Sequence, residues 1–158
     1  MRRSDREVTN KSEIIEILDK CEVCRLAFSS NDVPYIVPMN YGYDYRDEKL
    51  TLYFHGASEG KKHDVMNANP IVCFEMDCSH KLIEDEKAEN YTMEYESVIG
   101  LGKTEKCDNN AEKAHALTQL MKKYANDRAF TFPDHVLNSV TVFKVNVTEF
   151  TGKRLTVS

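Results

Sequence analysis

The chain has 158 residues, of which 41% are hydrophobic and 30% are charged. This balance is typical of one globular domain with a hydrophobic core, so we expect a single domain over residues 1–158. With 21 Lys and Arg against 26 Asp and Glu, the formal charge is −5. An acidic chain argues against a general nucleic-acid binder, because phosphate contacts need a basic surface, but it does not exclude a local anion site.

The N-terminus and the cysteines favour a cytoplasmic protein. The basic start at Met1 leads directly into charged residues, and no apolar run has the length of a signal or a membrane span. Five cysteines are an odd number in a chain large enough to fold without disulfides, which favours reduced thiols. Cys21 and Cys24 have the spacing of half a zinc site, but no second pair completes it, so we predict no metal.

The first third of the chain predicts a helix and then three strands. Asn10 and Glu13 have the spacing of a capping box, and a helical apolar stripe follows up to about Cys21. Two β-rich segments separated by a turn at Asn31-Asp32 predict a hairpin, and a third segment extends it to a meander. These three strands are predicted over residues 22–30, 35–43 and 49–55.

The rest of the chain predicts two helices and three more strands. Ser58 is expected to cap a helix that Pro70 ends, and Asn109 is expected to cap an amphipathic helix. The polar residues 78–90 predict a mobile connection. The last three strands are predicted over residues 71–76, 91–106 and 140–150. Six strands of mostly hairpin type favour an antiparallel barrel of mainly β or α+β class.

Two segments suggest a ligand site. Gly56 and Gly60 precede Lys61 and Lys62 at a predicted helix start, where backbone amides, glycines and ammonium groups together suit a phosphate. The alternative is a solvated helix start with surface lysines.

The second segment contains Pro38 inside a predicted strand, where its missing N–H interrupts the ladder. A flat ring could use the freed edge through the backbone of Met39 and the amide of Asn40. An edge strand whose proline prevents aggregation is the alternative, and both readings stay open.

Several segments in order, residues 1–7, 24–28, 35–41, 52–56, 60–62, 67–70 and 95–103, resemble the pyridoxamine 5′-phosphate oxidase-like FMN-binding superfamily. Within it, the chain is most similar to the nitroimidazole-resistance-like group. The resemblance implies a six-stranded antiparallel split barrel with flanking helices, in a homodimer that holds FMN between its subunits.

The resemblance also implies a role for each matching position. Lys61 and Lys62 match the pair that binds the FMN phosphate, although the oxidases commonly have Arg-Lys there. Ser97 and Val98 match a strand segment that approaches the flavin of the other subunit. The positions expected to line the isoalloxazine or lie beside it are Val37, Pro38, Met39, Asn40, His55 and Gly56.

The function implied by the resemblance is that of an FMN-dependent oxidoreductase reducing a small acceptor such as a nitroaromatic compound. The cofactor carries such chemistry, so no catalytic acid or base need be visible in the sequence. The chain has no Trp, so it lacks the tryptophan-containing C-terminal pattern of the oxidases, which argues against vitamin B6 oxidation. Two alternatives remain: a non-catalytic flavin-binding or redox-sensing module, and a haem-binding split barrel with His55 as candidate ligand.

Overall fold

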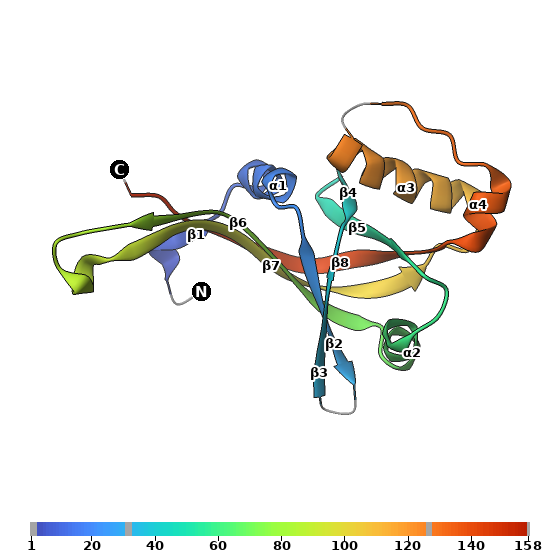
Figure 1. The fold of residues 1–158 in the computed structure, drawn as a ribbon, viewed down its shortest axis with the longest axis horizontal. Helices are drawn as coiled ribbons and strands as arrows, with labels where there is room; N and C mark the ends of the chain where they lie inside the picture. The colour runs from blue at the N-terminus through green and yellow to red at the C-terminus, as the bar shows by residue number, and fades with distance from the viewer. Residues whose placement is uncertain (1–2, 31–32, 126–127, 158) are drawn as a thin grey trace.

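The computed structural model describes residues 3–30, 33–125 and 128–157, and one antiparallel sheet dominates them (Figure 1). The sheet follows the order β3-β2-β6-β7-β8-β5-β4, and β1 pairs with β8 beside this path. The strands are β1 (Glu7–Val8), β2 (Cys24–Ser30), β3 (Val33–Met39), β4 (Gly42–Arg46), β5 (Lys49–Gly56), β6 (Ile71–Ile83), β7 (Thr92–Lys106) and β8 (Thr141–Leu155). The helices are α1 (Lys11–Lys20), α2 (Lys61–Ala68), α3 (Asn110–Ala125) and α4 (Asp134–Ser139), with short 3-10 turns η1 (Ser4–Arg6) and η2 (Ala88–Asn90).

The expected mainly β class with flanking helices is confirmed, but the sheet has eight strands in the described residues rather than six. The predicted strand 35–43 is in fact two strands, β3 and β4, and β1 was not predicted. The predicted three-stranded meander is therefore wrong, because β3 and β4 lie at opposite ends of the sheet path. The predicted turn at Asn31-Asp32 lies outside the described residues.

Tyr41 explains why the strand is interrupted. Its side chain is fully buried, and the single O–H of its hydroxyl is shared between the carbonyls of Leu18 (2.6 Å) and Cys21 (3.0 Å) at the end of α1. Its backbone N–H donates to the Tyr124 hydroxyl at 3.1 Å instead of to a strand. The ring is thus anchored in the core, and the backbone leaves the ladder to place it there.

The long hairpin of β6 and β7 also differs from the prediction. The segment 78–90 was expected to be a mobile connection, but β6 continues through it to Ile83 and pairs with β7. A bulge between Cys78 and Lys81, with Ser79 at a φ of 59°, interrupts the register. A bulge allows one extra residue in a continuing strand. Because the segment is polar, it lacks the alternation of hydrophobic residues that would predict a strand. The hairpin extends beyond the body of the sheet (Figure 1).

The helix starts confirm two of the three predicted caps. The side chains of Asn10 and Asn109 each accept a backbone N–H at 2.9 Å, from Ser12 and Glu112. Ser58 does not cap α2; the N-cap is Gly60, at a φ of 122° that favours glycine. The short helix α4 was not predicted.

The core lies between the sheet and the helices. Phe54 and Phe143 stack at 5.2 Å between ring centroids on the neighbouring strands β5 and β8, and both are fully buried. No helix of the described residues is long and apolar enough to cross a membrane.

Candidate functional site

The loop between β5 and α2 presents two lysines at a helix start. The His63 side chain is buried, and its Nε2 lies 2.6 Å from the carbonyl of Ala57, while its backbone N–H donates to Gly60 O at 2.9 Å. These contacts fix the path of the loop, so that Lys61 and Lys62 occupy the first turn of α2. The positive end of the helix dipole adds to their charge there. Sequence analysis assigned no role to His63.

Lys62 points back to the sheet and is half-buried. Its Nζ lies 3.9 Å from Met39 Sδ on β3 and 5.6 Å from the centre of the Phe143 ring on β8. A Cβ placed on Gly56 would lie 2.6 Å from the same Nζ, so the glycine leaves the space that the ammonium group occupies. Burial lowers the pKa of Lys62.

None of these neighbours is an anion. A thioether is a weak acceptor, and an aromatic face attracts a cation only modestly. In the described residues no carboxylate forms an ion pair with Lys62. A partly desolvated cation without an opposite charge is costly, so the burial of this ammonium group is not offset by an ion pair within the described residues.

Lys61 lies on the other side of the helix start and is exposed. Its Nζ is 4.5 Å from the centre of the Tyr35 ring, which in turn lies 6.1 Å from the ring of Phe28. The two lysines therefore join α2 to β3 through different partners, although β3 is more than twenty residues earlier in the chain.

The edge of β3 has the free side that the sequence suggested. Within the described chain β3 pairs only with β2, and Pro38 lies exposed opposite Arg25. Val37 and Met39 are partly buried against the core, so their side chains point to the same side of the strand. The Asn40 amide donates to the carbonyl of Glu22 at 3.4 Å. A flat ligand placed along this edge would meet backbone groups and the Met39 thioether.

The structure brings part of the predicted site together. Met39 and Gly56 both lie beside the end of the Lys62 side chain, and Val37, Pro38 and Asn40 are on or next to the strand that contains Met39. His55 is exposed, in the residue before Gly56 on β5. Tyr35 and Phe143 contact the lysines but were not predicted as site residues. No sequence pattern identifies these two residues as neighbours of the lysines, because the contacts join segments that are far apart in the chain.

Ser97 and Val98 lie elsewhere in the protomer. Both are in β7, where Val98 is fully buried and pairs with Met76 and Gly152. Lys106, which pairs with Phe143, is nine residues further along the strand, a distance of about 30 Å. A contact of Ser97 or Val98 with a flavin therefore depends on a second subunit and stays a prediction.

The cysteine pair that resembled half a zinc site is part of the core. Cys21 and Cys24 are free thiols with no exposed surface, and burial raises the pKa of both. The described residues contain no group of three His, Cys, Asp or Glu side chains able to hold a metal ion.

The sequence profile described as pyridoxamine 5′-phosphate oxidase matches residues 10–154, nearly the whole chain. The chain belongs to the pyridoxamine 5′-phosphate oxidase family. Among solved structures, this family member is similar to a candidate 5-nitroimidazole antibiotic resistance protein from Bacteroides thetaiotaomicron VPI-5482. The two are 34% identical with a TM-score of 0.82, over 94% of this chain and 86% of that one. The expected split-barrel fold is thereby confirmed.

More distant structures share the fold of this oxidase-family chain. The flavocytochrome Anf3 from Azotobacter vinelandii is 20% identical with a TM-score of 0.80, over 99% of this chain and 72% of that one. An FAD-binding protein from Mesorhizobium loti is 22% identical with a TM-score of 0.65, over 96% and 98% of the two chains. No curated protein is a significant match. These likenesses extend the shared fold to proteins of much lower sequence identity.

Proposed function

We propose that this chain binds FMN in a homodimer and passes electrons from a donor such as a nicotinamide to a small acceptor, for example a nitroaromatic compound. The observation that carries the proposal is the half-buried ammonium group of Lys62, which lies against Met39 and Gly56 without an anionic partner in the described residues. A phosphate would supply that partner. The fold of flavin-binding relatives and the free edge of β3 then favour a flavin as the body of the ligand.

The residues present fit FMN. Lys62 and Lys61 would hold the phosphate at the start of α2, with the α2 amides as further donors. The backbone of β3 from Val37 to Met39 would lie along the ring system, and Gly56 would keep the space beside the phosphate site open. When bound, FMN would supply the redox chemistry, the transfer of electrons from the donor to the acceptor. The protein's part is to bind, orient and shield.

A second copy of the chain is proposed to complete the site. Ile36, Ala27, Cys73 and Leu101 are directly paired across β3, β2, β6 and β7, and they form an apolar row on the outer face of the sheet. Ile36 is 59% exposed and Leu101 is 39% exposed, which is unusual for a contiguous patch on a monomer.

This face also connects the two parts of the predicted site. Ser97 and Ile99 precede Leu101 at two-residue intervals on β7, so they share its face, while Ile36 adjoins Val37 on β3. A partner packed on this row would therefore lie close to the β3 edge. That arrangement supports the role of Ser97 toward a flavin in the other subunit.

Binding of FMN tests the phosphate site directly. Titration should show that FMN binds more tightly than riboflavin, which has the same ring system without the phosphate. Lys62→Ala should weaken FMN binding tenfold to about a hundredfold and leave riboflavin unchanged, because a charge-assisted hydrogen bond is worth about 1.5–3 kcal/mol. Lys49→Ala, at an exposed lysine remote from the site, is the matched control. Equal affinities for FMN and riboflavin in the unmodified protein would contradict the proposal.

Light scattering tests the dimer. Leu101→Lys should give a monomer and reduce FMN affinity, whereas Val136→Lys, at a similarly exposed apolar position on α4, should change neither. A monomeric unmodified protein that binds FMN fully would reject the shared site.

Turnover separates an enzyme from a flavin-binding module. Steady oxidation of NADH or NADPH that depends on a nitroimidazole supports the oxidoreductase. Slow autoxidation of bound flavin alone would favour the non-catalytic alternative.

A further inference from the structure

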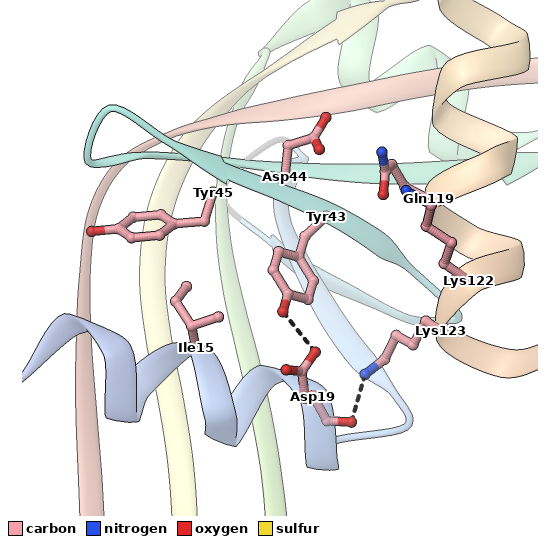
Figure 2. Close-up of a pocket in the computed structure, with 8 residues that line it drawn as sticks. All are labelled: Ile15, Asp19, Tyr43, Asp44, Tyr45, Gln119, Lys122 and Lys123. Carbon is pink, nitrogen blue, oxygen red and sulfur yellow. Dashed lines mark hydrogen bonds between the residues drawn. The ribbon is translucent and has the colours of Figure 1, made fainter. Parts of the chain in front are cut away.

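A cavity of about 410 Å³ lies between α1, β4 and α3, away from the lysines at the start of α2 (Figure 2). Its volume is within the range of small-molecule sites. It shares no lining residue with the proposed flavin site, and the inference drawn from it does not depend on that proposal.

One side of the cavity is apolar and aromatic. Tyr45 and Tyr43 come from β4 and Ile15 comes from α1, and their side chains face the same space (Figure 2). The Tyr45 ring is held in place by an edge-to-face contact with Phe150, at 6.4 Å between centroids and 88° between planes. Such a wall suits a flat or apolar body.

The two carboxylates that line the cavity are already engaged. Asp44 Oδ2 accepts from the Tyr53 hydroxyl at 3.0 Å and lies 2.5 Å from His115 Nε2. Asp19 Oδ1 accepts from the Tyr43 hydroxyl at 2.6 Å. Both carboxylates therefore already have hydrogen-bond partners within the protein.

The α3 side of the cavity has N–H groups that can donate to a ligand. Lys123 Nζ donates to the carbonyls of Leu18 (2.6 Å) and Asp19 (3.1 Å), and its ammonium has a third N–H. Gln119 and Lys122 make no hydrogen bond to another residue of the cavity lining (Figure 2). Free donors on one wall and an aromatic surface on the other define an amphipathic anion as the fitting ligand.

We propose that this cavity binds a small carboxylate with a flat apolar body. The carboxylate contacts Lys122 and Gln119, and the body lies against Tyr45, Tyr43 and Ile15. Because Ile15 comes from α1 and Lys122 and Gln119 come from α3, the ligand bridges the two helices.

Calorimetry with indole-3-acetate and indole-3-acetamide tests the charge requirement, because the two probes differ mainly in the carboxylate. It uses the full chain, both as purified and saturated with FMN. Indole-3-acetate should bind at one site per chain, at least about tenfold more tightly than the amide. Lys122→Ala and Gln119→Leu should each weaken indole-3-acetate binding about tenfold, and Lys49→Ala should leave it unchanged.

The double substitution Lys61→Ala and Lys62→Ala separates this cavity from the flavin site. Indole-3-acetate binding that survives this variant and is unaffected by FMN supports the cavity. Loss of binding in the variant, competition with FMN, equal affinity for the amide, or no saturable binding would each overturn the inference.

Discussion

The chain has two pairs of consecutive lysines, Lys61-Lys62 and Lys122-Lys123, which lie at opposite ends of their helices and have different surroundings. The first pair begins α2, where the helix dipole is positive, and in the described part of the chain the Lys62 ammonium group contacts a thioether and an aromatic ring. The second pair is in the last turn of α3, where the dipole is negative, and Lys123 donates to two carbonyls of α1. Burial lowers the pKa of both Lys62 and Lys123. What differs is whether the protein itself satisfies the buried charge.

The contrast indicates that Lys123 stabilises the fold, and it supports the proposal that Lys62 binds an anion. A charge that is already hydrogen-bonded contributes to stability, whereas one without partners is tolerated at a cost. Substitutions near the two pairs should therefore differ in their effects on unfolding free energy and on FMN affinity.

Glycine substitutions beside the two pairs should have very different consequences. A Cβ on Gly42 would lie 2.4 Å from the backbone of Gln119 in α3, which cannot move locally, so Gly42→Ala should destabilise by about 3 kcal/mol. A Cβ on Gly56 would meet only the end of the Lys62 side chain, which can swing away. Gly56→Ala should thus keep its stability in urea and lose FMN affinity. Equal destabilisation by both changes would show that the Lys62 ammonium is not free to move.

Two cations that are paired with a buried carboxylate, Glu96, provide a reference for the two lysine pairs. The contribution of this cluster to stability depends on pH and can be measured. Glu96 is buried and accepts from Lys20 (2.8 Å), Ser79 (2.8 Å) and Arg154 (2.7 Å). Burial opposes ionisation, but these hydrogen bonds outweigh it and lower the pKa of Glu96 to about 2.

Because the folded pKa of Glu96 is depressed, its contribution is complete above its ordinary pKa of 4.5 and is lost as the pH falls toward about 2. We expect the unfolding free energy to fall by about 2 kcal/mol over this range, a value that already includes a reduction because Lys20 is exposed to solvent. Urea titrations between pH 5 and 2 should show a flatter profile for Glu96→Gln. An identical slope in the variant would assign the acid sensitivity to other groups.

Replacing each buried lysine by methionine should change stability in opposite directions. Lys123→Met leaves the carbonyl of Asp19 without its donor and removes one of the two donors near the carbonyl of Leu18, so it should cost about 1–2 kcal/mol. Lys62→Met removes a charge without anionic partners and should stabilise the flavin-free protein by about 0.5–1 kcal/mol, while weakening FMN binding. Thermal melting with and without FMN measures both. Destabilisation by Lys62→Met would show that its present contacts satisfy it.

The smallest effect is expected for Lys61→Gln. Lys61 is exposed, and its contact with the Tyr35 ring at 4.5 Å is worth about 0.5 kcal/mol. Stability should change by no more than that, and FMN affinity should fall less than in Lys62→Gln. A larger loss of affinity than in Lys62→Gln would reverse the assigned roles of the two lysines.

Much of this protein was predictable from local sequence. The caps at Asn10 and Asn109, the strand that ends at Gly56 and the helix that begins with the lysines depend on near neighbours, and short-range patterns report them. The order of segments was also enough to indicate the family. The bulge at Ser79 and the cap at Gly60 were missed because backbone conformation, not side-chain type, decides them.

Only the tertiary structure decided which strands are neighbours and which lysine ammonium group donates hydrogen bonds to backbone carbonyls. The anchoring of Tyr41 under α1 separates β3 from β4, and pairing of β5 with β8 brings Phe143 to Lys62. The sequence by itself determined that two lysine pairs exist and that one begins a helix. Whether an ammonium group is satisfied depends on carbonyls and rings from distant segments, and that information is present only once the chain has folded.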